Sequence, residues 1–402
     1  MKLTEVEDII FFQKEKLSAK LGMQRDMMTS LAQPVEGFAT VISGIRRCGK
    51  STLMAQVIDK LQEPCLYINF DTPKLNAFGV DDFELIDALA IKTGARNLFF
   101  DEIQLVSGWE SYVRSALDAG YRVMVTGSNA TMLSQELGTR LTGRHITKEM
   151  FPFSFQEYCR FRNVQPSDES LNGYLREGGF PQYLKQRDEE LLEALLDDIL
   201  FRDIAVRYGV KDVAALRSLM FYLITNIGNL VSANKLTAAV QVKTAKTVLE
   251  YFSYYVQTYL VSFVSKFSYS YKSQMISPKK VYCIDNGLHM AVTTSANTDE
   301  GRRLENMVYG ELRRRYKQLY YYNEGTGECD FIVCEKNMPT AAYQVCYELN
   351  RENESREVGG LLSAMKELNI ANGKILTFNQ TDTILKDGKR IEVKPVWDST
   401  VF

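Results

Sequence analysis

The feature that most constrains this chain is the stretch "VISGIRRCGKSTLM" at residues 41–54. A short apolar run ends at Gly44, and a Gly-Lys-Ser triplet follows five residues later, so the stretch fits the spacing G-x-x-x-x-G-K-[ST] without a mismatch. Glycines allow a loop to turn successive backbone N–H groups toward one side. The apolar run predicts a buried strand, and residues 49–61 predict a helix that begins at the loop.

A loop of this kind binds phosphate groups. Inward-facing N–H groups and the positive end of the following helix both attract phosphate oxygens. In this pattern Lys50 reaches the β- and γ-phosphates, and the Ser51 hydroxyl ligates Mg²⁺. We therefore expect ATP and Mg²⁺ as ligands of a site formed by Gly44, Ile45, Arg46, Arg47, Cys48, Gly49, Lys50, Ser51 and Thr52.

An acid pair follows another apolar run, in "NLFFDEIQ" at residues 97–104. Carboxylates at the end of a neighbouring strand suit a metal ion that also binds phosphate. We expect Asp101 to hold Mg²⁺, either directly or through water, and Glu102 to orient and deprotonate the attacking water. The presence of Glu102 favours hydrolysis over passive binding.

Two further groups are candidates for contact with the γ-phosphate. Ser128 or Asn129, in "VTGSN", ends the next predicted strand and would sense the γ-phosphate, cap the following helix, or do both. Arg140 and Arg144, in "GTRLTGRH", would touch phosphate within the chain or from a neighbouring subunit. The alternative for both arginines is ordinary surface charge. These four residues join Lys50 and Glu102 as candidate catalytic residues.

Composition favours a globular protein of two or three domains with reduced cysteines. The chain has 402 residues, of which 45% are hydrophobic and 24% charged, and its net charge is -2. The seven cysteines form no C-x-x-C pair and only two histidines are present, so a zinc site is not expected. Cys48 lies at a predicted helix N-terminus, a position that lowers the pKa of some thiols, but we interpret it as a bystander.

Neither a signal peptide nor a membrane span is expected. Residues 1–20 are charged throughout, and the longest apolar run, at residues 254–264, is too short and too polar to cross a bilayer. Together with the reduced cysteines, these features predict a cytoplasmic protein.

Short apolar runs alternate with helical patterns through the first part of the chain. Such alternation predicts an α/β fold with a parallel sheet covered on both faces. After Arg144 the pattern becomes mainly helical, and from about residue 279 it returns to α/β. The predicted strands of the first part are residues 38–43, 65–70, 97–100 and 122–127.

Local charge differs from the net charge. Residues 231–280 hold seven lysines and one acid, Glu250. Lys235, Lys243 and Lys246 lie near a predicted short helix, and many aromatic residues follow. Such a segment suits contact with the phosphate backbone of DNA. A solvated helix in a packing domain is the alternative.

With these residues placed, the chain resembles the bacterial and archaeal AAA-type ATPases that carry a C-terminal domain of unknown function, DUF4143 (the AAA_14 family). The resemblance runs from before residue 40 to nearly the end. The ATPase motifs are shared by many P-loop proteins, whereas "FPFSFQEY", "GGFP" and "IDNGL" are more particular to this family. The other matching pieces are "GIRRCGKST", "NLFFDEIQLVSGWE", "VTGSNATML", "LTGR", "FRDIAVRY", "RLENMVYGELRRR", "ECDFIV" and "IEVKPVWD".

The resemblance implies a P-loop NTPase parallel-sheet core, then a helical and winged-helix-like module, then a C-terminal α/β domain similar to restriction endonucleases. The domains expected on this basis are an N-terminal helical segment at 1–35, the ATPase core at 36–150, a helical lid or linker at 151–203, the winged-helix-like module at 204–270 and the C-terminal domain at 271–402.

Nucleases of the C-terminal type gather an acid on a helix, an acid on a strand and an acid-x-Lys pair on the next strand around Mg²⁺. The matching positions are Glu305, Asp330, and Gln344 with Cys346. Gln344 is a neutral, weaker metal ligand, and Cys346 replaces the lysine. The resemblance therefore implies a nuclease-like domain whose site is catalytically degenerate and which acts as a scaffold for a partner.

The combined prediction is a Mg²⁺-dependent ATPase whose nucleotide state is passed to C-terminal modules. These modules would contact DNA through residues 231–280 or a protein through the C-terminal domain, and oligomerisation is compatible with this function. The alternatives are an ATP-gated switch that hydrolyses little and a nuclease with a divergent site. A small-molecule kinase is less favoured, because the acid pair suits the activation of water.

Overall fold

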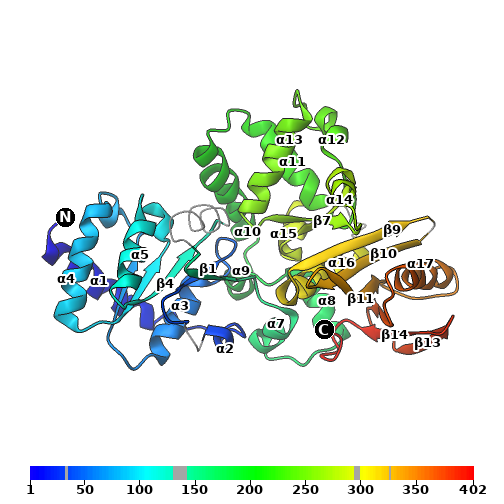
Figure 1. Ribbon diagram of the computed structural model, residues 1–402, viewed down its shortest axis with the longest axis horizontal. Coiled ribbons are helices and arrows are strands. Elements are labelled where there is room, and N and C mark those ends of the chain that lie inside the picture. The colour runs from blue at the N-terminus through cyan, green and yellow to red at the C-terminus, as the bar shows by residue number, and fades with distance from the viewer. Residues whose placement is uncertain (32–34, 130–142, 294–298, 326) are drawn as a thin grey trace. The chain divides into compact units, whose positions relative to one another are not determined.

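The chain divides into two compact units, each with its own sheet. Unit 1 comprises Met1–Phe151 with the tripeptide Gln257–Tyr259, and unit 2 comprises Pro152–Val256 with Leu260–Phe402. In this computed structural model, residues 1–31, 35–129, 143–293, 299–325 and 327–402 are described (Figure 1).

The sheet of unit 1 has five strands, and every pair of neighbours is parallel. The strand order is β2-β3-β4-β1-β5. The predicted parallel sheet is confirmed, and β5 is a strand that the apolar pattern did not predict. The strands are β1 (Ala39–Ser43), β2 (Cys65–Asn69), β3 (Asn97–Asp101), β4 (Arg122–Gly127) and β5 (His145–Glu149).

One face of this sheet is covered by helices with apolar stripes. Alternate residues of a strand point to the same face, and Leu66 with Ile68 and Leu98 with Phe100 are such pairs. They join one buried cluster with side chains from α1, α4 and α5. The helices of unit 1 are α1 (Leu3–Ser18), α2 (Met28–Leu31), α3 (Lys50–Lys60), α4 (Phe83–Thr93) and α5 (Trp109–Asp118), with short 3₁₀ turns at Pro73–Leu75, Val80–Asp82 and Ile103–Leu105.

The strand order decides which loops meet. Parallel strands all end at the same edge of the sheet, and β4 lies between β1 and β3. The loop after β1, the acid pair at the end of β3 and the residues after β4 therefore lie at one edge. Neighbouring strands are about 5 Å apart, so these groups fall within about 10 Å of one another.

Unit 2 begins with short helices. The first is set by a capping box in "FPFSFQEY": the Glu157 N–H donates to Ser154 Oγ at 3.2 Å, and the Ser154 N–H donates to the Glu157 carboxylate at 3.0 Å. These helices are α7 (Phe155–Arg162), α8 (Asp168–Glu177), α9 (Pro181–Gln186) and α10 (Glu190–Asp197), and α10 continues as a π-helical segment, η4 (Asp198–Val206).

The middle of unit 2 follows the order helix, strand, two helices, strand, helix and strand. Strand β8 pairs antiparallel with both β6 and β7. Helices α11, α13 and α14 of this part of unit 2 are labelled in Figure 1. The elements are α11 (Val213–Thr225), β6 (Leu230–Val231), α12 (Ala233–Ala239), α13 (Ala245–Gln257), β7 (Val261–Lys266), α14 (Tyr271–Ile276) and β8 (Lys279–Cys283).

The last part of unit 2 extends the same sheet to nine strands, in the order β13-β14-β12-β11-β10-β9-β7-β8-β6. Buried side chains of α17 and of strands β9, β10, β11, β12 and β14 form its core, and the partly buried Ile384 of β13 packs against it. None of the helices in the described ranges is long and apolar enough to cross a membrane. The elements are α15 (Asn286–Val292), α16 (Glu300–Arg315), β9 (Gln318–Glu324), β10 (Gly327–Glu335), β11 (Met338–Val345), α17 (Glu354–Glu367), β12 (Asn372–Thr377), β13 (Asp382–Lys386) and β14 (Lys389–Pro395).

Candidate functional site

The loop after β1 has the backbone that the sequence pattern predicts. Gly44, Arg47 and Gly49 all have positive φ angles, of 154°, 62° and 106°. A Cβ atom on Gly44 would lie 2.1 Å from the carbonyl oxygen of Met150, so no other residue fits there. Helix α3 begins at Lys50, directly after Gly49. The loop therefore forms a concave nest of backbone groups at a helix N-terminus.

Lys50 is held by this loop. Its side chain is 5% exposed, and its Nζ donates to the carbonyl oxygens of Gly44 at 3.0 Å and Ile45 at 3.1 Å. These acceptors are neutral, so the ammonium charge is solvated by backbone dipoles. Ser51 and Thr52 follow in the first turn of α3 and are partly exposed.

Asp101 is fully buried at the end of β3. Its carboxylate accepts hydrogen bonds from Tyr67 Oη at 3.0 Å, from Asn69 Nδ2 at 3.2 Å and from the Thr126 hydroxyl. These donors come from β2 and β4, the two neighbours of β3. A buried carboxylate needs such donors because it has left water.

Glu102 has an unusual backbone conformation. Its φ of 54° is left-handed, which costs a residue with a side chain about 1 kcal/mol or more. Its N–H donates to Thr126 Oγ1 at 3.0 Å, and Gln104 donates to its carboxylate. Burial raises the pKa of Glu102, and the nearby charge of Lys50 opposes part of that rise. Strain of this kind is concentrated at functional sites.

Ser128 and Asn129 lie between the loop and the acid pair. Gly127 of β4 is level with Ser43 of β1, so Ser128 is level with the first residue of the loop. Both side chains are buried, at 6% and 2% exposure. The strand order therefore brings both residues to the edge of the sheet where the sequence predicted them.

The structure does not bring Arg144 to the loop within this chain. Arg144 precedes β5, and its Nε donates to the Gly37 carbonyl oxygen at 3.0 Å while its guanidinium pairs with Asp118. Gly37 lies before the start of β1, at the opposite edge of the sheet, so about 15 Å separates it from the loop. Arg140 lies outside the described residues.

Cys48 is buried beneath the loop. Its Sγ lies 3.6 Å from the carbonyl oxygen of Met150, and its side chain is fully shielded from solvent. Burial raises the pKa of this thiol, which is opposite to the effect of a helix N-terminus. This direction agrees with a bystander and not with a reactive thiolate.

The nuclease-like positions in unit 2 also lie together, with an unexpected cation among them. Lys280 Nζ is 2.7 Å from Asp330 Oδ1 and 3.2 Å from Glu305 Oε1. Lys280 is 3% exposed, and Tyr282 Oη donates to Glu305 Oε1 at 2.6 Å. Lys280 was counted above among the cations of residues 231–280, but it is buried and paired and is not available to a partner.

Gln344 and Cys346 complete this cluster without supplying a charge. The Asp330 N–H donates to Gln344 Oε1 at 3.2 Å, and Gln344 Nε2 donates to the buried Glu357 at 2.6 Å. Burial raises the pKa of Cys346 to about 11. Within the described residues, no group of three or more His, Cys, Asp and Glu side chains could hold a metal ion.

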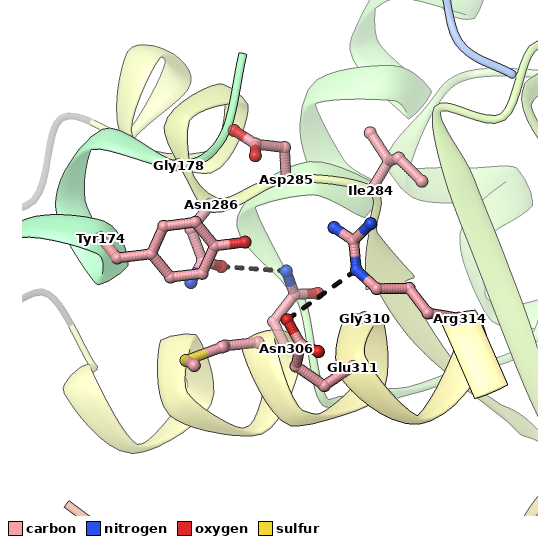
Figure 2. A pocket seen from close by; sticks show the side chains of 10 residues that line it. Tyr174, Gly178, Ile284, Asp285, Asn286, Asn306, Gly310, Glu311 and Arg314 are labelled. Carbon is pink, nitrogen blue, oxygen red and sulfur yellow. Dashed lines mark hydrogen bonds and ion pairs between the residues drawn. The ribbon is translucent and has the colours of Figure 1, made fainter. Parts of the chain in front are cut away.

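The segments "GGFP" and "IDNGL" meet beside a small cavity in unit 2 (Figure 2). Asp285 accepts hydrogen bonds from the Gly179 N–H at 2.6 Å and the Gly287 N–H at 2.8 Å. A Cβ on Gly178 would lie 1.9 Å from Asp285 Oδ1. The cavity beside these residues measures about 20 Å³, which is enough for one water molecule but not for a substrate.

Several residues of the site were not predicted from the sequence. Tyr67, Asn69 and Thr126 hold Asp101, and Lys280 holds the second cluster. Asn69 carried a usable signal, because it ends an apolar run and strand ends meet at one edge of a parallel sheet. The other contacts join residues that no local pattern connects.

Two family models match the chain. Residues 36–159 match AAA_14, described as an AAA domain. Residues 168–299 match DUF8612, a domain of unknown function. The second match differs from the DUF4143 domain that the motifs led us to expect, so that assignment is not confirmed.

Two relatives match over most of their length. The Methanocaldococcus jannaschii protein MJ1544 is 34% identical over an alignment of 389 residues that covers 89% of this chain and 87% of that protein. A Haemophilus influenzae protein is 32% identical over an alignment of 334 residues that covers 78% of this chain and 83% of that protein. Both are named only as uncharacterized proteins, so their names carry no activity.

Solved structures match more weakly. Cdc6p from Pyrobaculum aerophilum has a TM-score of 0.27 and 12% identity, and the match covers 62% of this chain and 87% of that one. The signal transduction ATPase PH0952 from Pyrococcus horikoshii also has a TM-score of 0.27, with 14% identity over 74% of this chain and 47% of that one. TM-scores this low support no argument about function.

The fold and the sequence matches agree on the first half of the chain. A five-stranded parallel sheet, a phosphate-binding type of loop and the AAA-domain match together identify a P-loop ATPase core. The long matches extend the relationship to nearly the whole chain. The chain belongs to the same protein family as MJ1544 of Methanocaldococcus jannaschii, and its residues 36–159 match the AAA domain of AAA_14.

Proposed function

We propose that this protein is a Mg²⁺-dependent ATPase whose active site lies at the edge of the unit 1 sheet. One observation carries the proposal: the nest with Lys50 and the acid pair of Asp101 and Glu102 meet at that edge, and Glu102 is strained. A buried carboxylate in a costly backbone conformation close to a buried ammonium is an arrangement that clusters at functional sites.

The loop and the acid pair fit a metal-bound triphosphate. The nest presents N–H groups to phosphate oxygens, and Lys50 would exchange its two carbonyl acceptors for the β- and γ-phosphates. Ser51 and, through water, Asp101 would hold Mg²⁺, which supplies neutralisation of the phosphate charge. Coordination through water suits Asp101, because three protein donors already occupy its carboxylate.

Glu102 would accept the proton of the attacking water. A carboxylate with a raised pKa is a stronger base than one in water. Ser128 or Asn129, level with the loop, would contact the γ-phosphate from the side. Any contact of Arg144 with phosphate would be on a neighbouring subunit, because Arg144 lies at the opposite edge of its own sheet.

Phosphate release by the purified chain tests this proposal. Wild type should release phosphate from ATP in a Mg²⁺-dependent way, and Glu102→Gln should reduce kcat by about 10²- to 10⁴-fold. The control is ATP binding by Glu102→Gln, which should persist. Release by wild type no greater than by Glu102→Gln would instead support a non-hydrolysing, ATP-gated switch.

A second role, contact with DNA, is favoured by the middle of unit 2. The element order from α11 to β8 supports a winged-helix-like module. Lys235, Lys243 and Lys246 are exposed, and the segment between β7 and β8 exposes Tyr269 and Tyr271 at 77% and 75%. Exposed lysines and aromatic rings suit contact with phosphates and bases. We therefore propose that this module contacts DNA and is coupled to the nucleotide state.

The C-terminal part of unit 2 is proposed to be a nuclease-like scaffold without catalysis. The order α16-β9-β10-β11-α17-β12 and the meeting of Glu305 with Asp330 support the nuclease-like fold. The Lys280 ammonium lies between these acids, where it would repel a divalent cation. Such a domain would serve as a surface for a protein or nucleic-acid partner.

Two assays test these roles together. ATPase activity should rise when duplex or single-stranded DNA is added, and equal activity with and without either DNA would shift the proposal toward a protein partner. Plasmid incubated with Mg²⁺ or Mn²⁺ should remain uncut. Metal-dependent cutting that is lost in Asp330→Ala would overturn the scaffold proposal.

A further inference from the structure

Arg25, outside every motif considered above, is buried against the loop that follows β1. Its side chain is 5% exposed. Its Nη1 donates to the carbonyl oxygen of Cys48 at 2.9 Å, and its Nη2 donates to the carbonyl oxygen of Phe151 at 2.8 Å. One guanidinium thus spans the phosphate-binding type of loop and the residue at which unit 1 ends.

Arg25 is itself fixed to the helix that follows the loop. Its N–H donates to Gln56 Oε1 at 3.4 Å, and Gln56 Nε2 donates to the carbonyl oxygen of Met23 at 2.8 Å. Gln56 lies on α3 and is buried. The segment around Arg25 therefore moves with α3, and the guanidinium has a defined place under the loop.

The end of unit 1 is packed against the same loop by its backbone. The Met150 N–H donates to the Ser43 carbonyl oxygen at 2.6 Å. The Met150 carbonyl oxygen occupies the space that a Cβ on Gly44 would need. A Cβ on Gly49 would lie 3.5 Å from both Arg25 Nη1 and Met150 Cε. Met150 therefore packs against both glycines of the loop motif, and Phe151 accepts a hydrogen bond from Arg25 beneath the loop.

The bond to Cys48 has a geometric consequence for phosphate binding. In a planar trans peptide the carbonyl and the next N–H point in opposite directions. Because Arg25 holds the Cys48 carbonyl on the buried side, the Gly49 N–H points to the other side of that peptide. A charge-assisted bond to a carbonyl is stronger than a neutral one, so it resists rotation of the peptide plane.

We propose that Arg25 is a positioning residue for the ATPase. It fixes the Cys48–Gly49 peptide so that the Gly49 N–H is aimed at the bound phosphates, and through Phe151 it links the state of the loop to the chain that enters unit 2. This inference rests on the proposed function of the loop. Arg25 touches no reacting atom in this role and acts through the backbone it holds.

Equilibrium binding and steady-state kinetics of the full chain test the inference. Arg25→Gln keeps hydrogen-bonding groups but loses the charge and the fork, so ATP should bind about 10- to 100-fold more weakly. KM for ATP should rise while kcat at saturating ATP stays within about twofold, because the water-activating groups are untouched. Arg96→Gln, at an exposed position of unit 1, is the matched control and should equal wild type.

Amide hydrogen exchange separates positioning from simple stabilisation. In wild type, Mg²⁺-ATP should slow exchange in residues 43–52 and also at Met150, whose N–H bonds to Ser43. In Arg25→Gln at saturating ATP, slowing should persist in residues 43–52 and be lost at Met150. A residue with only a structural role would leave this ATP-dependent pattern unchanged.

Arg25→Lys keeps the inference testable if Arg25→Gln folds poorly. One ammonium can bond to one of the two carbonyls but lacks the fork that reaches both, so ATP affinity should fall about 3- to 10-fold in a folded protein. If wild type binds Mg²⁺-ATP and both variants match it in affinity and in exchange at Met150, the inference alone is overturned. If wild type itself does not bind Mg²⁺-ATP, the proposed function fails and this inference fails with it.

Discussion

Each unit of this protein gathers one lysine and a group of acids in one place, two acids in unit 1 and three in unit 2, yet the charges are used differently. In unit 1, Lys50 donates to backbone carbonyls, and Asp101 accepts from neutral side chains. In unit 2, Lys280 is paired directly with Asp330 and Glu305. In the first arrangement Lys50 and Asp101 bond to neutral groups, whereas in the second the opposite charges pair with one another.

This difference follows from the backbone around each lysine. The loop after β1 offers its own carbonyl oxygens to Lys50, so no acid is needed to keep the ammonium buried. Lys280 lies within β8, where backbone groups pair with β6 and β7. Only side chains remain as partners for the Lys280 ammonium group, and these partners are acidic. Similar residue types thus give a candidate active site in one unit and an internal ion-pair cluster in the other.

The largest predicted effect is on the stability of unit 2. Lys280→Met leaves at least two acids in a buried cluster without their cation, so unfolding should become easier by about 3–5 kcal/mol. Urea denaturation followed by circular dichroism measures this loss. Lys272→Met, at an exposed position of α14, should stay within about 0.5 kcal/mol of wild type. A loss below about 1 kcal/mol would mean that the cluster is not held by this pairing.

The second prediction concerns pH. Burial and the adjacent Asp330 raise the pKa of Glu305 to about 7, above its ordinary value of 4.5. As pH rises from about 4.5 to 7, the unfolded chain ionises at this residue and the folded chain does not, so this group costs wild type stability. Relative to wild type, Glu305→Gln should therefore gain about 1 kcal/mol per pH unit over this range.

Urea midpoints measured for both proteins across this pH range test that slope. Glu335→Gln, at an exposed position of β10, is the control and should show no comparable trend. If the stability difference between wild type and Glu305→Gln did not change with pH, the raised pKa of the buried Glu305 carboxyl would be contradicted.

The third prediction concerns the exposed lysines of unit 2. Lys243→Ala combined with Lys246→Ala should weaken binding of duplex DNA about tenfold and flatten its salt dependence, because up to two phosphate contacts are lost. Fluorescence anisotropy at several salt concentrations measures both effects. The control, Lys317→Ala with Lys386→Ala, removes the same charge from exposed positions elsewhere. Equal weakening in both double variants would point to net charge and not to a binding surface.

The smallest predicted effect is on the stability of unit 1. Lys50→Met should lower the free energy of unfolding by only about 1–2 kcal/mol, because the lost bonds join the ammonium group to two neutral carbonyl oxygens and no buried charge is left without its partner. Thermal unfolding of the two proteins gives this value. A loss of 3 kcal/mol or more would place Lys50 in the same class as Lys280 and remove the contrast between the units.

Local patterns in the sequence predicted the loop and the acid pair well. The loop spacing is contiguous, and each of the four predicted strands of unit 1 appears within two residues of its expected bounds. β5 was missed because "HITKE" is short and polar and has no apolar run. The β13–β14 hairpin was also missed, although Asp387-Gly388 at its turn, both with positive φ, is a recognised signal.

Contacts between distant residues could not be predicted in this way. Tyr67 and Thr126 reach Asp101 only because β3 lies between β2 and β4, and strand order is not written in any local pattern. Lys280 was read as part of a basic surface because Glu305 and Asp330 lie 25 and 50 residues further along the chain. Arg25 was missed because no motif surrounds it.

Calorimetric titration of Mg²⁺-ATP into wild type and Lys50→Met tests the central claim most directly. The account predicts saturable binding to wild type and affinity at least about 100-fold weaker in Lys50→Met, with both proteins folded. Wild type that produces no saturable binding, or a folded Lys50→Met that binds as tightly as wild type, would contradict it.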